Sequence, residues 1–467
     1  GAGASPGSRG TLETVLARLQ AGGSAPTESR QAAEREVLAA LPQLEPARAV
    51  DLVVRVHSVE QLRGSMQLLE ELCRVLAANV PRFRSPDLAR LTETLAAWAK
   101  ASAGEERMPR LPEAVRSYFG AVSSEITLRL MDVAPADLAR TATAVAALGV
   151  GSTRLFASIA RAVVARADRF APGELVLLID AFDQARCFHT SLYEALARCL
   201  RHNARHAAPK DIVLGLSSLA ASGVKADGLG DAIGDHLPNT AIAKGLFTAD
   251  EACRLAWAFC ALDLHHDKLF RAVFRALEDA PVQASQTLCQ LYEIHLTLKA
   301  FHYSSYVEYE LEDDTAKSLR DHYRRHPLLL KKERSSERLH SDVADLLREV
   351  LDASVSTAHV TSPGFTVDVA AMPRGRRSSS SAEPLAILDI DGPHTLIRSL
   401  DPLENTVGAA PRIHGSVSLK RRVLQKRGFR LVVFAEETWR GLDGNREKRE
   451  FLRSALRKAG VSEDRFR

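Results

Sequence analysis

Residues 385–396 read Leu-Ala-Ile-Leu-Asp-Ile-Asp-Gly-Pro-His-Thr-Leu. An apolar, β-prone run that ends in Asp-x-Asp-Gly-Pro predicts a buried strand followed by a tight turn. The carboxylates of Asp389 and Asp391 would then stand at the edge of a sheet, where ligands and metals commonly bind. This stretch therefore predicts a C-terminal domain that contains a sheet.

The segments around this strand predict the other elements of the same domain. Residues 365–370 and 429–434 predict two more strands of a mixed sheet, and residues 417–427 predict a basic amphipathic helix that ends at Gly428. A last helix is expected around residues 448–452, and an amphipathic helix at residues 340–352 leads into the domain.

This order of elements, with Trp439 after the last strand, resembles the RAP domain. RAP domains are RNA-associated modules of organellar proteins and are abundant in apicomplexan parasites. The similarity covers residues 363–460, and we assign residues 363–467 to the domain. It implies a small α/β domain similar to the restriction-endonuclease-like fold.

The charge of the chain is unevenly distributed. Residues 411–467 hold sixteen Lys and Arg against seven Asp and Glu, a net charge of +9, whereas the whole chain carries +4. The rest of the chain is therefore at −5. A basic terminal domain favours a polyanionic partner, although a solvated surface has the same composition.

The middle of the chain repeats itself. A start signal recurs at Pro135, Pro172 and Pro209, each with an acidic residue two positions later, and a fourth unit opens at Thr248. Proline and then an acid is typical of a helix N-terminus. The second helix of each unit keeps the same register, at Leu155, Leu192, Leu229 and Leu269. Repeats of about 37 residues, each a helix pair, predict an α-solenoid without strands between residues 134 and 280.

The repeats resemble heptatricopeptide-type arrays and the helical region of FAST-kinase-like proteins, in which the solenoid is thought to lie along RNA. Six residues after each second-helix landmark stand Arg161, Arg198, Asp235 and Arg275. The three arginines would form a stripe that contacts phosphates. A solvated helix face in an arginine-rich protein is the alternative.

Residues 292–334 join the repeats to the terminal domain. Five of the seven tyrosines lie here, and basic residues follow from Arg324. Such aromatics either stack unpaired bases or pack the end of the array against the next domain, and we favour packing. Residues 374–382 predict a basic low-complexity loop.

The acidic residues raise the question of metal-dependent catalysis. Asp368, Asp389 and Asp391 end two predicted strands, and nucleases of the fold that the RAP resemblance implies hold Mg²⁺ with such carboxylates. Those nucleases place a lysine two residues after the second acid, where this chain has Asp391. We therefore expect no catalysis, no cofactor and no metal, with Asp391 capping its turn and Asp389 paired with a base such as Lys420.

The predicted helix 417–427 offers the stronger RNA-binding surface. Leu419, Val423 and Leu424 form its inward face, so its cations are expected to project away from the core. Clustered cations bind phosphates without reading bases. The predicted RNA-binding residues are Lys420, Arg421, Arg422, Lys426, Arg427, Arg430, Arg161, Arg198 and Arg275.

These observations predict a mostly α protein with four parts: a degenerate helical region (1–133), the solenoid and its closing helices (134–335), a linker helix (336–362) and the RAP-like domain. The six cysteines lie in apolar helical patterns and predict buried thiols in a reducing compartment. The longest apolar runs are too short to span a membrane. The chain begins Gly-Ala-Gly-Ala without methionine, from which we expect that a targeting peptide has been removed.

The resemblance implies a non-catalytic RNA-binding protein of the mitochondrial matrix, with the plastid or apicoplast as second choice. Its RNA would be ribosomal, bound as a mitoribosome subunit or as an assembly or processing factor, beside other mitoribosomal or RNA-processing proteins. Two alternatives remain. One is a metal-dependent RNA endonuclease, and the other is a protein-binding solenoid scaffold.

Overall fold

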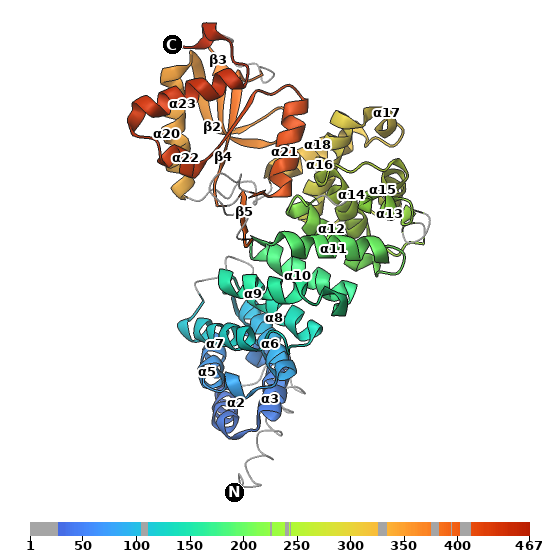
Figure 1. The fold of residues 1–467 in the computed structure, drawn as a ribbon, viewed down its shortest axis with the longest axis vertical. Coiled ribbons are helices and arrows are strands. Elements are labelled where there is room, and N and C mark those ends of the chain that lie inside the picture. Colours follow the sequence, from blue (N-terminus) through green and yellow to red (C-terminus); the bar gives the residue numbers. More distant parts are fainter. Residues whose placement is uncertain are drawn as a thin grey trace. The chain divides into compact units, whose positions relative to one another are not determined.

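The computed structural model describes residues 27–103, 111–224, 227–238, 242, 244–325, 334–374, 383–393, 395–401 and 412–467. The described chain is mostly helical, with small sheets near its C-terminal end (Figure 1). It forms two units. The first takes in residues up to Cys199 and a short segment that begins at Ser399, and the second takes in the rest. His394 and most of the predicted basic loop, residues 375–382, lie outside the described residues.

The first unit consists of helices that stack in register. Its helices are α2 (Thr27–Ala40), α3 (Pro46–Ser58), α4 (Glu60–Arg63), α5 (Met66–Ala77), α6 (Ser85–Ala103), α7 (Glu113–Arg129), α8 (Pro135–Ala147), α9 (Thr153–Val164), α10 (Pro172–Gln184) and most of α11 (Thr190–Asn203). Helix α8 packs on α6 and α10 on α8, while α9 packs on α7. First helices thus contact first helices, as expected of a solenoid.

The second unit continues the helix pairs. It contains α12 (Pro209–Ala221), α13 (Leu229–Gly234), α14 (Ala249–Ala261), α15 (Asp267–Asp279), α16 (Ser285–Phe301), α17 (Tyr303–Tyr306) and α18 (Asp313–Arg325). Helix α14 packs on α12, α16 on α14 and α18 on α16.

The repeat landmarks are confirmed. Helices α8, α10 and α12 begin at the three predicted prolines, and α14 begins after Thr248, whose hydroxyl accepts a hydrogen bond from the Glu251 amide. The four landmark leucines of the second helices are all buried. Equivalent positions therefore have equivalent environments, which is the property that defines a structural repeat.

The expectation of no strand between residues 134 and 280 is wrong at one place. Cys187 and Phe188 form the two-residue strand β1 in the turn between α10 and α11. Arg186, just before it, has a positive φ of 50°, which ends helix α10 and lets the chain extend. The Phe188 carbonyl accepts a hydrogen bond from the Leu400 amide, so the turn is extended because it pairs with a distant segment.

The terminal domain is a four-stranded mixed sheet with helices on both faces (Figure 1). Its strands are β2 (Ala353–Val360), β3 (Thr366–Pro373), β4 (Ala386–Asp391) and β7 (Leu431–Ala435), in the order β2-β3-β4-β7. Only the β4–β7 pair is parallel. Two short strands, β5 (Leu396–Ser399) and β6 (Arg412–Ile413), pair outside this sheet, and the helices are α20 (Arg334–Val350), α21 (Gly415–Lys426), α22 (Glu436–Arg440) and α23 (Gly444–Lys458).

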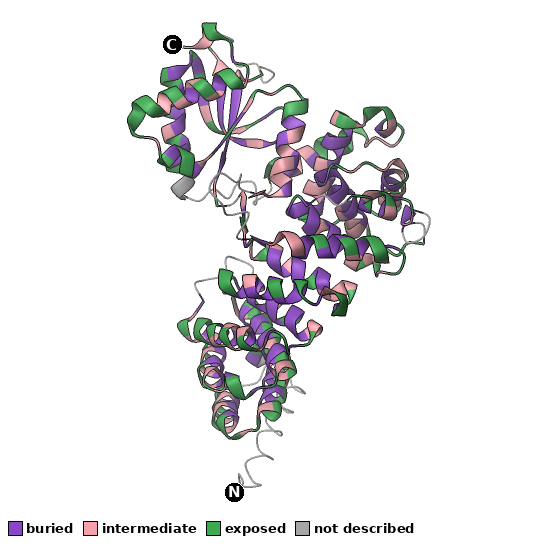
Figure 2. Cartoon of the chain, in the orientation of Figure 1, coloured by how far each residue is buried: buried purple, intermediate pink, exposed green. Residues whose placement is uncertain are grey.

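Strand β4 is buried along its whole length (Figure 2). Leu388 and Ile390 belong to the core that the sheet shares with α20 and α23. Because side chains alternate along a strand, Asp389 and Asp391 point to the opposite face, where α21 lies. The two carboxylates are thus placed side by side under the basic helix.

The expected linker helix over residues 336–362 is only partly correct. Helix α20 ends at Val350, and residues 353–360 form strand β2, which pairs antiparallel with β3 from Ala353 opposite Pro373. Helix α20 supplies Val343 and Leu347 to the core of the sheet. Strand β2 forms the edge of the sheet beside β3. Both α20 and β2 therefore belong to the terminal domain and not to a linker.

Candidate nucleic-acid interface

Asp389 and Asp391 lie in a buried ion-pair network with Lys420 and Arg421 of α21. The Lys420 Nζ donates to Asp389 Oδ1 at 2.7 Å, and the Arg421 Nε donates to Asp389 Oδ2 at 2.8 Å. The rest of the Arg421 guanidinium binds both oxygens of Asp391, at 2.7 and 3.1 Å. Both aspartates and Arg421 are buried, at 3%, 5% and 7% exposure. Every carboxylate oxygen of the pair thus holds a cationic donor.

This network also fixes the ionisation of its members. Burial alone would raise the pKa of Asp389, but the charges and hydrogen bonds of Lys420 and Arg421 hold it below its ordinary value. Burial would lower the pKa of Arg421, yet its two aspartate partners raise it above its ordinary value. Asp389 and Arg421 are therefore both charged at neutral pH.

Asp368 lies apart from this network. Its Oδ2 accepts a hydrogen bond from the Ile390 amide at 2.8 Å, and its Oδ1 lies 3.5 Å from the buried His340 Nε2. Within the described residues, no group of three His, Cys, Asp or Glu side chains is arranged to hold a metal ion. The predicted pairing of Asp389 with Lys420 is confirmed, and Asp391 accepts from the Thr395 hydroxyl in its turn, as a capping role requires.

Helix α21 is enclosed on two sides. One side faces the sheet, and the other packs on α12, α14 and α16. At its start, a Cβ placed on Gly415 would lie 1.8 Å from the Ala220 carbonyl oxygen, so only glycine permits this approach. Further along, Arg422 donates to the Cys260 carbonyl at 2.5 Å and pairs with Asp263 at 2.8 Å.

These contacts lie at the C-terminal ends of the repeat helices α12 and α14. The last carbonyls of a helix have no partner within it and carry partial negative charge, so cations bind there. Arg422 occupies this place on α14, and Arg412, just before α21, donates to the Ser222 carbonyl at the end of α12. The expectation that Arg421 projects to the surface is wrong because Arg421 lies on the side of α21 that faces the sheet, where it binds Asp389 and Asp391. Arg422, on the side that packs on the repeats, is largely occupied by the end of α14.

The remaining basic residues of the predicted set are exposed. In the terminal domain these are Lys426, Arg427 and Arg430. In the second helices of the repeats, the side chains of Arg161, Arg198 and Arg275 are exposed, as the spacing predicts. Arg161 lies 3.4 Å from the Ser158 hydroxyl, and Arg198 lies 3.9 Å from Glu194. The exposed cations of the predicted set thus lie in two places, around the end of α21 and on the repeats.

Three of the five tyrosines between residues 292 and 323 are buried, in line with the packing role favoured from the sequence, whereas Tyr303 is 51% exposed. Tyr292, Tyr306 and Tyr323 are buried, and the Tyr292 hydroxyl donates to the Pro363 carbonyl at 2.6 Å. Glu293 accepts hydrogen bonds from the Trp257 indole at 2.7 Å and the Tyr323 hydroxyl at 3.0 Å. Burial raises the pKa of Glu293 to about 7, although these donors lower it.

Sequence reasoning missed an aromatic surface at the end of α16. Phe301 closes this helix with 36% exposure, and the ring of His302 stacks on that of His265 with 3.7 Å between centroids. The Lys426 ammonium lies 5.7 Å from the centre of the Phe301 ring. The run Phe301-His302-Tyr303 was its signal, but only the topology brings His265 and Lys426 to it.

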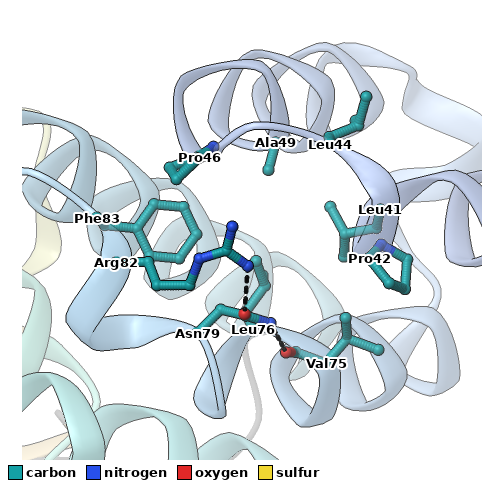
Figure 3. A pocket seen from close by; sticks show the side chains of 10 residues that line it. All are labelled: Leu41, Pro42, Leu44, Pro46, Ala49, Val75, Leu76, Asn79, Arg82 and Phe83. Carbon is teal, nitrogen blue, oxygen red and sulfur yellow. Dashed lines mark hydrogen bonds between the residues drawn. The ribbon is translucent and has the colours of Figure 1, made fainter. Parts of the chain in front are cut away.

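The first unit contains a small pocket between α3 and α5 (Figure 3). Its walls are apolar apart from Asn79 and Arg82, and the Arg82 guanidinium donates to Asn79 Oδ1 at 3.2 Å. The cavity of about 20 Å³ has room for about one water molecule. It is too small for a nucleotide or a cofactor.

Part of the chain matches the model of a known protein family. The family model of the RNA-editing substrate-binding complex 6 protein matches residues 118–319. The matched segment runs from within α7 into α18, so it covers the repeats that contain Arg161, Arg198 and Arg275 and the aromatic surface at the end of α16. No curated protein matches the chain.

The matched segment ends at residue 319, before the first strand of the four-stranded sheet. The family model therefore does not cover the terminal domain. In the described part of the chain, no helix has the length and apolar character needed to cross a membrane.

Proposed function

We propose that this chain is a non-catalytic RNA-binding protein whose repeats and exposed terminal cations hold the phosphate backbone. The observation that carries the proposal is the match of residues 118–319 to a family whose name refers to an RNA-editing substrate-binding complex. The exposed arginines Arg161, Arg198 and Arg275 lie inside this segment at equivalent repeat positions. Equivalent cations on successive repeats suit a polyanion with a regular charge spacing.

The finer assignment combines this match with the resemblance of the terminal domain to RAP domains. On that basis, the chain acts in the mitochondrial matrix, with the plastid as second choice, within an RNA-processing, RNA-editing or mitoribosomal assembly. Ribosomal RNA is the proposed ligand, and proteins of that assembly are the proposed partners. Sequencing RNA that is crosslinked to the protein in cells tests this assignment, and recovery of cytosolic RNA alone would contradict it.

The mode of binding is tested by salt titration with single-stranded RNA. One variant carries Arg161→Ala, Arg198→Ala and Arg275→Ala, and a second carries Lys426→Ala, Arg427→Ala and Arg430→Ala. Each lost phosphate contact should reduce the slope of log K against log salt by about 0.7. A slope reduced by about 1 to 2 in either variant identifies that source of cations as a contact surface.

Two cations of α23 provide a matched control. Arg446 and Lys458 are exposed on a helix of the opposite sheet face from α21, so their replacement by Ala should leave the slope unchanged. An equal loss of slope in the control would mean that binding follows net charge alone. Unchanged slopes in both test variants would contradict the proposed surfaces.

The endonuclease alternative requires Asp368, Asp389 and Asp391 to bind a metal. Lys420 and Arg421 occupy the carboxylate oxygens of two of them, and a metal would have to displace both cations. Incubation with single-stranded RNA and Mg²⁺ or Mn²⁺ tests this alternative. Cleavage that is lost in folded Asp368→Ala and Asp389→Ala variants would establish the nuclease and overturn the proposal.

A further inference from the structure

The aromatic surface at the end of α16 combines three rings with a neighbouring cation. We define the aromatic ledge as His265, Phe301 and His302. The His265 and His302 rings are almost parallel, with 10° between their planes, and His265 stacks in turn on the buried Phe270 at 5.5 Å. The Phe301 and His302 rings lie 6.5 Å apart. A column of rings therefore runs from the core to the surface.

The ledge is held by the packing beneath it. Phe270 belongs to α15 and Phe301 to α16, while His265 lies in the turn before α15. Burial lowers the pKa of both His265 and His302, so that neither ring is charged near neutral pH. Neutral rings stack without repelling one another, which agrees with their close approach. The ledge is thus fixed in place before any ligand arrives.

The charge around the ledge is positive. Lys426 lies over the Phe301 ring, and Arg427 follows it on the exposed end of α21. Asp263 pairs with Arg422 at 2.8 Å, and Asp267 and Glu308 share Arg271, so these groups together with Lys426 and Arg427 leave positive charge in excess. Exposed rings beside uncompensated cations are the arrangement by which proteins bind unpaired nucleotides.

We infer that the aromatic ledge stacks unpaired bases, so that the RNA held by this chain is single-stranded where it crosses the end of α16. This inference rests on the proposed function and adds the class of RNA to it. Phe301 offers its exposed ring to a base, and Lys426 and Arg427 bind the phosphates on either side. A duplex has its bases stacked on one another and can offer only phosphates to this surface.

The test compares two ligands of equal charge, a ten-residue oligouridylate and an abasic strand of the same length. Affinity is measured by fluorescence anisotropy at fixed salt. The native chain should bind the oligouridylate about tenfold more tightly, since stacking of one base contributes between about fivefold and about a hundredfold in affinity. Phe301→Leu should reduce the ratio of the two affinities by about fivefold and leave the affinity for the abasic strand unchanged. Phe301→Trp should preserve the ratio.

Three controls make the result decisive. Leu246→Ala removes a side chain that is 58% exposed in the same unit, and it should leave the ratio unchanged. Denaturation midpoints of the Phe301 variants equal to that of the native chain show that folding is intact. The native Trp98, Trp257 and Trp439 are buried, so the new indole of Phe301→Trp should report the base directly by quenching of its fluorescence.

The outcomes separate the two proposals. Equal affinity of the native chain for both strands, or an unchanged ratio in Phe301→Leu, would overturn the ledge while leaving electrostatic RNA binding in place. In that case the proposed occupant of the aromatic ledge would be a polypeptide partner and not a base. Failure of both strands to bind at low salt would overturn the proposed function itself.

Discussion

The basic residues of α21 and the arginines of the repeats look alike in the sequence and differ in the structure. Arg421 is buried and holds two aspartates, and Arg422 closes the end of α14, whereas Arg161 and Arg275 stand at the surface. Both groups lie on helices with one apolar face. The difference comes from what covers the second face of each helix. The sheet and the ends of the repeat helices cover α21, whereas Arg161 and Arg275 face solvent.

The basic residues of α21 have two different roles, because some bind other parts of the protein and others remain at the surface. In α21, Lys420 and Arg421 bind the carboxylates of β4 and Arg422 binds the end of α14, whereas the basic residues after Arg422 are exposed. A net charge of +9 in residues 411–467 therefore overstates the charge that RNA can reach. Substitutions in the two groups should therefore differ in their effect on stability as the residues differ in position.

The largest effect is expected at Arg421. Arg421→Ala leaves the buried Asp389 and Asp391 with Lys420 as the only cation of the network, and removal of one member of a buried ion pair costs about 3–5 kcal/mol. The free energy of unfolding should fall by this amount in urea titration. A loss below about 1 kcal/mol would mean that the network is open to water, and the contrast between buried and exposed cations would fail.

The docking of α21 on the repeats can be tested separately at Gly415. Gly415→Ala sets a methyl group against the Ala220 carbonyl, so it should destabilise the protein by about 1–3 kcal/mol. Gly120 is the matched control, because a Cβ there meets nothing within 4 Å inside helix α7. Gly120→Ala should instead stabilise by about 0.5–1 kcal/mol. Equal effects of the two substitutions would show that α21 does not dock as described.

Sequence reasoning reached most of the fold because its signals are local. Proline followed by an acid marks the start of a repeat helix, and short apolar, β-prone runs mark strands β3, β4 and β7. Strand β2 was missed although Ala353 and Val355 alternate with Ser354 and Ser356, because the amphipathic helix before it was extended too far.

The candidate site was predicted less well, since its properties depend on distant partners. The pairing of Lys420 with Asp389 was anticipated because one basic helix had to lie near one acidic strand. The second cover on α21 comes from α12 and α14, more than 150 residues away, as the Arg422 contact with Cys260 shows. The same distance hid the approach of Lys426 to Phe301. No local pattern predicts which face of a helix another domain covers.

A smaller effect tests the packing at the junction through pH. The pKa of Glu293 is raised to about 7 in the folded chain, so between its ordinary value and about 7 the folded state holds a proton that the unfolded state has lost. This contribution to stability is complete at low pH and is lost as the pH rises through that range. From pH 5 to pH 8 we expect a loss of about 1–2 kcal/mol.

The measurement needs a variant because a neighbour acts in the opposite sense. Burial lowers the pKa of His295 to about 4, and this residue adds stability as the pH rises towards its ordinary value. Glu293→Gln keeps an acceptor for the Trp257 indole but removes the titration. The difference between native and variant unfolding free energies should therefore change with pH. A constant difference would place Glu293 in water and its tyrosine neighbours outside the packed junction.

The smallest effect is expected at Arg161, the counterpart of Arg421 in the repeats. Its guanidinium is exposed and its described contact is the Ser158 hydroxyl at 3.4 Å, so Arg161→Ala removes no buried partner. The unfolding free energy should stay within about 0.5 kcal/mol of the native value, while the slope of RNA affinity against salt falls by about 0.7. Urea titration and salt titration on the same preparation measure both. A loss of stability near that of Arg421→Ala would show that Arg161 holds the repeats together, and the exposed cations of the solenoid would then have to be counted as structural, like those of α21.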